Sequence, residues 1–222
     1  AQNKTSIVTY ESFDLPAVAE LTPDLVLAST EIHDQRIAGF FDKVKMNLYF
    51  QNYASLEDIF ASIRQTGQMV GREQAANHLA DSLAALTKMV TDSTAGQLKY
   101  KTAIVLGIDP ITVVGSASFM NDLLKKAGGK NAFGELTERY PTVTAADFIK
   151  AAPEYVILPT TNDKAWNDLV AMHPDIQLNI PAATDHHIFQ VEPEVIVVPG
   201  PRIVEGLSYL TRVLHSRVSV PF

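Results

Sequence analysis

The stretch that decides the fold is His187-Ile188-Phe189-Gln190-Val191-Glu192-Pro193, followed by Val198-Pro199-Gly200-Pro201-Arg202-Ile203-Val204-Glu205-Gly206-Leu207. The β-branched and aromatic residues of the first part predict a strand. Residues 199–201 end it, because proline has no backbone N–H to donate within a sheet. Apolar residues then recur at helical spacing: Ile203, Leu207, Leu210 and Leu214. This order of strand, apolar loop and amphipathic helix is typical of an α/β domain.

The rest of the chain alternates in the same way. Strand-like apolar runs occupy 23–29, 45–50, 100–108, 155–158 and 187–192. Segments between them have helical periodicity, including a helix capped by Thr144 and one ended by Gly128-Gly129. Such alternation predicts an α/β fold with mostly parallel sheets flanked by helices. The continuous apolar run at 23–29 predicts a strand covered on both faces.

The longest helical pattern lies between the two halves. Ser55 is a candidate N-cap for a first helix, and Gly71 breaks the pattern. Nothing between Arg72 and Asp92 ends a second helix, which would be about 30 Å long. It is either an ordinary packing helix or a rod that joins two lobes. We expect two lobes, at 1–70 and 98–222, joined by a bridging helix at 71–97.

Composition excludes several classes of function. The chain has 222 residues, of which 46% are hydrophobic, and a net charge of −7. An acidic protein lacks the basic surface that nucleic acids require, so no nucleic-acid partner is expected. The absence of cysteine excludes disulfides, thiol catalysis and cysteine-ligated metals. No apolar run approaches the roughly 20 residues of a transmembrane helix. We expect a monomer.

Motifs of catalysis are missing as well. Residues 115–119 (Gly-Ser-Ala-Ser-Phe) fail the G-x-S-x-G pattern of a nucleophile elbow. Neither a dinucleotide-binding nor a phosphate-binding glycine motif occurs. We therefore expect a protein that is not an enzyme and has no intrinsic cofactor. Two alternatives stay open: a hydrolase or chelatase-like enzyme, and an interaction module without a pocket.

Four segments, in their order and spacing around the long helix, resemble those of class III solute-binding proteins. They are Leu21–Leu27, Val114–Leu124 with Ala127–Asn131, Tyr140–Thr144 with Ala152–Leu158, and the Pro-Gly-Pro-Arg run at 199–202. Proteins of this family deliver cobalamin, haem and iron–siderophore complexes to ABC importers. The resemblance implies a non-enzymatic receptor for a bulky metal chelate, on the periplasmic or extracellular side of the membrane, with an ABC permease as its partner.

The chain departs from the family in two respects. The family has a further βαβ unit before the segment that corresponds to Leu21–Leu27, and we expect a first lobe that is truncated or short. Family members also carry one glutamate per lobe for docking on the permease, and those positions are Pro16 and Ala146 here. Glu20 and Asp147 are the neighbouring carboxylates that would replace them.

The ligand site is expected where parallel strands end, because ligands of open α/β sheets bind beyond the carboxyl ends of the strands. Eight side chains in these places are the ligand-binding candidates: Ser29, His33, Tyr53, Ser116, Phe119, Thr160, Asn162 and Val197. Val195, Ile196 and Val197 would form an apolar lip. Aromatic, hydroxyl and amide groups together suit a large, partly apolar ligand. Alternatively, these polar groups serve only the backbone of their loops.

Charge narrows the ligand class. Arg36 and Arg202 are the cations near these loops, and Arg202 is expected to serve the start of its helix. Trianionic catecholate complexes are therefore disfavoured, since they need several cations. Hydroxamate complexes and corrinoids fit better, and haem fits if His33, His186 or His187 ligates the iron. The scattered histidines predict no site for a free metal ion.

Overall fold

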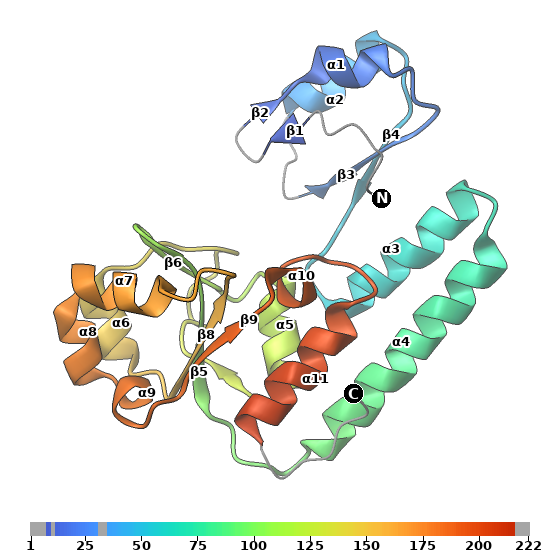
Figure 1. Cartoon of the computed structure of the whole chain (residues 1–222). Helices are drawn as coiled ribbons and strands as arrows, with labels where there is room; N and C mark the ends of the chain where they lie inside the picture. Colours follow the sequence, from blue (N-terminus) through green and yellow to red (C-terminus); the bar gives the residue numbers. More distant parts are fainter. Residues whose placement is uncertain (1–7, 10–11, 31–34, 216–222) are drawn as a thin grey trace. The chain divides into compact units, whose positions relative to one another are not determined.

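The structure is a computed structural model that describes residues 8–9, 12–30 and 35–215 of the chain (Figure 1). The chain divides into two compact units, 1–53 and 54–222. In the described part, no helix combines the length and the apolar character needed to cross a membrane. The lobes at 1–70 and 98–222 and the bridging helix at 71–97 stay predictions.

The first unit contains the predicted βαβ arrangement. Its elements are β1 (Val8–Thr9), β2 (Ser12–Phe13), α1 (Leu15–Glu20), β3 (Val26–Ser29), α2 (Gln35–Lys43) and β4 (Leu48–Gln51). Strands β3 and β4 pair in parallel, with Val26 opposite Leu48 and Ser29 opposite Gln51. The predicted burial of this strand is wrong: β3 is only half-buried, and Leu27 is 40% exposed. A two-stranded sheet gives little cover to either face.

The second unit begins with a helical hairpin. Helices α3 (Leu56–Met69) and α4 (Glu73–Ser93) run antiparallel, side by side (Figure 1). The predicted cap is confirmed, because the Ser55 hydroxyl accepts the Asp58 N–H at 3.1 Å. The predicted break is confirmed as well, since Gly71 has a φ of +66°, a conformation that glycine adopts at little cost. The uninterrupted helix predicted over 72–92 corresponds to α4.

The sheet of the second unit has five strands, mostly parallel. They are β5 (Lys101–Ile108), β6 (Ile111–Val113), β7 (Lys130–Asn131), β8 (Tyr155–Pro159) and β9 (Ile188–Val191). The order is β6-β5-β8-β9, and β7 also pairs with β5. Only β6 is antiparallel to its neighbour. The prediction of mostly parallel sheets is confirmed for this unit, although β6 was not predicted.

Helices cover both faces of this sheet (Figure 1). They are α5 (Phe119–Lys126), α6 (Ala145–Ala151), α7 (Ala165–Met172), α8 (Pro174–Asn179), α9 (Pro181–Thr184), α10 (Pro193–Ile196) and α11 (Ile203–Leu214). Alternate side chains of the central strands, such as Ala103, Val105 and Val156, pack with Phe148 and Leu169 into one buried cluster. The intervening residues point to the opposite face, toward the side of α5 and α11. The predicted helix after the Pro-Gly-Pro run is confirmed as α11.

Candidate ligand-binding site

Thr160, Asn162 and Val197 lie beyond the carboxyl ends of β8 and β9. We call this side of the sheet the carboxyl edge, and its loops include 160–164 and 192–202. Ser116 lies in the loop 114–118 after β6, which runs antiparallel to β5 with Val113 opposite Val105. The parallel register of β5, β8 and β9 brings the loops that follow β8 and β9 together.

Thr160 and Asn162 form a closed polar turn after β8. The Thr160 N–H donates to the Val191 carbonyl at 3.0 Å, and its hydroxyl accepts the Asn162 N–H at 3.0 Å. The Asn162 side chain accepts the Lys164 N–H at 3.0 Å and donates to Asp168 at 3.3 Å. Asn162 is exposed, but both side chains serve the loop itself. The alternative that these groups satisfy backbone is therefore supported at both positions.

The apolar lip differs from the prediction. Residues 193–196 form the short helix α10, which turns Val195 and Ile196 inward, with 7% and 0% of their surface exposed. Val197 remains half-buried, and Val198 is 51% exposed. The expected lip of three valine and isoleucine side chains is therefore wrong for the first two. Residues 197–198 present the apolar surface of this loop.

Ser116 is held by the backbone of a neighbouring loop. Its hydroxyl donates to the Leu136 carbonyl at 2.9 Å, and its N–H donates to the same oxygen at 2.8 Å. The preceding Gly115 N–H donates to the Arg139 carbonyl at 2.9 Å. Ser116 is half-buried, so its hydroxyl borders the surface of the loop in a fixed position.

Two buried asparagines, Asn121 and Asn131, hold the loop 114–118 in place through hydrogen bonds. Asn131 donates to the Val114 carbonyl at 2.9 Å and to the side-chain oxygen of Asn121 at 3.1 Å, and it accepts the Phe133 N–H at 2.9 Å. Asn121 in turn donates to the Ser116 carbonyl at 3.0 Å. We call this pair the asparagine clamp. Both residues lie in segments that resemble the family, but the sequence predicted no role for them. The feature of the sequence that could have drawn attention to Asn131 is the Gly-Gly pair directly before Lys130.

Phe119 is not open to a ligand. It is the first residue of α5, whose N-cap is Ser118, and only 1% of its surface is exposed. The expectation that its ring offers an aromatic face to the ligand is wrong, because the first turn of α5 directs the ring into the core.

The first unit contains the other three candidates. Ser29 ends β3, and Tyr53 follows β4, where its hydroxyl donates to the Gln51 side chain at 2.7 Å. Thr30, next to Ser29, donates to the Asn52 side chain at 3.4 Å. The carboxyl ends of β3 and β4 thus share a polar rim, as expected of a parallel pair. His33 and the Arg36 side chain lie outside the described residues.

His186 and His187 lie at the opposite edge of the sheet. They precede β9, and the His187 ring stacks on Tyr155, the first residue of β8, with 4.3 Å between ring centroids. A His187 ring nitrogen contacts the Glu154 carbonyl at 3.2 Å. Neither residue borders the carboxyl edge, and an axial role of either in haem binding stays a prediction. Both residues come before the first residue of β9 rather than after its last.

Arg202 has the structural role expected of it. Its guanidinium contacts Glu194 at 2.8 Å and Glu205 at 3.0 Å, just before α11 begins. These carboxylates, Glu205 above all, raise the pKa of Arg202. The guanidinium therefore joins α10 to α11, and its charge is balanced by two carboxylates.

The predicted docking positions lie on exposed helix starts and ends. Pro16 in α1 and Ala146 in α6 are exposed, and so is Glu20, the last residue of α1. Asp147 is already engaged in a capping box, accepting the Thr144 hydroxyl at 2.6 Å while its own N–H donates to that hydroxyl at 3.1 Å. The hydrogen bonds from Thr144 hold the pKa of Asp147 below its usual value.

Replacing Thr144 by alanine is expected to destabilise the fold by about 1 kcal/mol, the usual cost of losing an N-cap. The pKa of Asp147 should then rise toward its ordinary value, which an NMR pH titration of the carboxyl carbon measures. Because the folded-state pKa of Asp147 is lowered, the stabilisation that its hydrogen bonds with Thr144 provide is present above the unfolded-state pKa. This stabilisation is lost as the pH falls through the folded-state pKa. The Thr142→Ala variant, at an exposed position outside the helix, should leave the titration of Asp147 unchanged.

Among the described residues, no group of three or more histidine, aspartate or glutamate side chains is placed so that it could hold a metal ion. The described part of the site thus consists of hydroxyls and amides engaged within their loops, together with apolar surface at residues 197–198.

The periplasmic binding protein family matches residues 1–195. The chain belongs to this family. A curated relative is the high-affinity heme uptake system protein IsdE of Staphylococcus aureus, which is 25% identical over 186 residues and aligns with 81% of this chain. The chain spans 63% of that relative's length.

Two solved structures of the class share the fold. The vitamin B12-binding protein BtuF of Vibrio cholerae has a TM-score of 0.82 at 15% identity, covering 94% of this chain and 80% of its own. A periplasmic heme-binding protein of Pseudomonas aeruginosa has a TM-score of 0.81 at 19% identity, covering 93% of this chain and 77% of its own. The predicted class III resemblance and α/β fold are confirmed. Family and neighbours are binding proteins, so the enzyme alternative is set aside.

Proposed function

We propose that this protein captures a bulky metal chelate outside the cytoplasm and delivers it to an ABC permease. The observation that carries the proposal is membership of the periplasmic binding protein family over residues 1–195. The names of the relatives support the ligand class, since heme and vitamin B12 are both metal chelates. Delivery to a permease, by a monomer and with carboxylates near Pro16 and Ala146 as docking groups, is part of the same proposal.

The described loops support a ligand of low charge. The cations of the described loops at the carboxyl edge are Arg202, which is balanced by Glu194 and Glu205, and the exposed Lys164. A trianionic catecholate complex would need additional cations. Hydroxamate complexes, corrinoids and haem are the candidates that remain. For haem, we propose His33 as the axial ligand, since His186 and His187 lie at the amino end of β9.

Thermal unfolding in the presence of haemin, cyanocobalamin, a ferric hydroxamate and a ferric catecholate tests this function. A ligand at 100 times its Kd stabilises the native state by about 2.7 kcal/mol. For a chain of this size the midpoint should rise by roughly 5–10 °C. We expect such a shift with one of the first three ligands and none with the catecholate. No shift with any chelate would contradict the proposal.

The haem case has a sharper test. If haemin is the ligand, the His33→Ala variant should lose the absorption band of haem with an axial histidine. The His78→Ala variant is the matched control, because His78 is exposed on α4 in the second unit. Equal spectra for the two variants would exclude His33 as the axial ligand.

A further inference from the structure

A hollow in the surface of the second unit lies at the amino-terminal end of the sheet, away from the carboxyl edge. It measures about 460 Å³ and is lined by Lys99, Lys125 and Lys130, together with one carboxylate, Glu135. Lys130 opens β7 and pairs with Lys101 at the start of β5, so the hollow lies at the amino-terminal end of these strands. We call it the lysine pocket. Its positive charge contrasts with the net charge of −7 of the whole chain.

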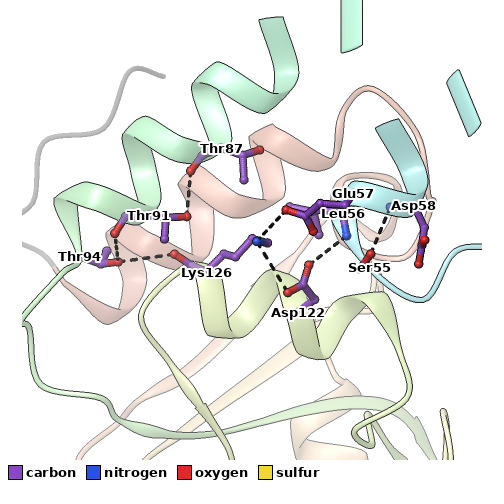
Figure 2. A network of polar contacts seen from close by, with 9 residues as sticks. All are labelled: Ser55, Leu56, Glu57, Asp58, Thr87, Thr91, Thr94, Asp122 and Lys126. Atoms are coloured by element: carbon purple, nitrogen blue, oxygen red, sulfur yellow. Dashed lines mark hydrogen bonds and ion pairs between the residues drawn. The ribbon is translucent and has the colours of Figure 1, made fainter. Parts of the chain in front are cut away.

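The three ammonium groups are available to a ligand. All three lysines are exposed, and none of them takes part in the ion pairs found among the described residues. The neighbouring Lys126 behaves differently: its ammonium group contacts Glu57 at 3.0 Å and Asp122 at 3.9 Å (Figure 2). Lys125 acts on Asp122 only through its charge. Three cations thus surround the hollow against one carboxylate.

The other walls offer little hydrogen bonding. The Asn131 side chain is already engaged in the asparagine clamp, and the N–H groups of Lys130 and Gly134 donate to the carbonyls of Tyr100 and Asn131. Recognition in the lysine pocket therefore rests on charge. Lysine binds phosphate as a point charge, and a phosphate group concentrates up to two negative charges on one centre.

We propose that the lysine pocket binds a phosphate group, carried either by a soluble phosphate compound or by an anionic lipid headgroup. Lys99, Lys125 and Lys130 hold the phosphate oxygens, and Gly134 leaves part of the wall without a side chain. The lysine pocket is separate from the proposed chelate site at the carboxyl edge. A failure of phosphate binding would therefore not contradict the proposed transport function, and a failure to bind a chelate would not contradict phosphate binding.

The test is a titration of the full chain with pyrophosphate at low ionic strength, followed by amide NMR. We expect the amide signals of Lys130, Gly134 and Glu135 to shift together. A triple variant, Lys99→Gln, Lys125→Gln and Lys130→Gln, should bind at least about tenfold more weakly, because its charged groups are removed while a polar side chain remains at each position. The control replaces the exposed Lys43, Lys45 and Lys150 by glutamine and has the same net charge.

The outcomes separate clearly. Equal weakening in both triple variants would overturn the proposal, since binding would then follow net charge alone; absence of localised shifts would overturn it too. Sedimentation with phosphatidylcholine vesicles, with and without phosphatidylglycerol, identifies the source. Binding to the anionic vesicles that pyrophosphate competes away assigns a lipid headgroup, and pyrophosphate binding without vesicle binding assigns a soluble phosphate compound. Added salt should weaken both vesicle binding and pyrophosphate binding, because it screens exposed charges.

Discussion

The Asn131→Leu variant is expected to lose about 4 kcal/mol of unfolding free energy. Asn131 is 7% exposed and joins the Val114 carbonyl, the Asn121 side chain and the Phe133 N–H. A buried polar group left without a partner costs about 1–3 kcal/mol, and this change leaves three. Leucine has the same branched shape as asparagine and is bulkier, so no space opens for a water molecule that would replace the amide. Denaturant unfolding measures the loss.

The matched control is Asn179→Leu, at an exposed position where the amide donates only to the Asp175 carbonyl, at 2.7 Å. That variant should change stability by less than about 1 kcal/mol, in keeping with surface substitutions. A loss of similar size in both variants would contradict the role assigned to the clamp. Amide hydrogen exchange adds a local measurement, because the Gly115 and Ser116 N–H groups should exchange faster only in the Asn131 variant.

The clamp also bears on ligand binding. Asn121 holds the Ser116 carbonyl, and Ser116 is one of the predicted ligand-binding residues. Loss of the clamp should therefore weaken chelate binding by the variant that remains folded, while Asn179→Leu leaves the affinity unchanged. Binding sites require side chains held in place by a supporting layer of hydrogen bonds.

Local signals in the sequence predicted local structure well. Ser55 and Thr144 were predicted as helix caps, and both hydroxyls accept the expected backbone N–H. The prediction that the Pro-Gly-Pro run ends the strand is wrong, because β9 already ends at Val191 and the short helix α10 follows; the run instead separates α10 from α11. The two caps depend on a few neighbouring residues, whose chemistry a sequence displays directly.

Burial and side-chain partners were harder to predict. Phe119 was predicted to lie in a helix and does begin α5, but the face of α5 that it occupies depends on packing against distant elements. His187 was predicted to lie in a strand, but it precedes β9, and this position decides which edge of the sheet it borders. The partners of Asn131 come from residues ten or more positions away in most cases. Such non-local contacts leave no periodic signal.

The Gly206→Ala variant is expected to lose about 3 kcal/mol, with a fall in the unfolding midpoint of roughly 6–12 °C. Gly206 lies in α11 directly against α10, where an added Cβ atom would overlap the Val195 carbonyl oxygen and approach the carbonyl carbon to 3.0 Å. Backbone atoms cannot move aside as a flexible side chain does. Helix α10 would have to shift away from α11, and with it the apolar residues 197–198 of the carboxyl edge.

The sign of the change makes this variant informative. Within a helix, replacing glycine by alanine ordinarily stabilises by about 0.5–1 kcal/mol, because the unfolded chain loses conformational freedom. A loss at Gly206 therefore measures the contact between α10 and α11 rather than helix propensity. Gly200→Ala is the control, since nothing lies within 4 Å of its added Cβ atom and it lies in the loop just before α11. A Gly206→Ala protein as stable as this control would contradict the close packing of α10, and residues 197–198 would then lack the rigid support that a ligand-binding lip requires.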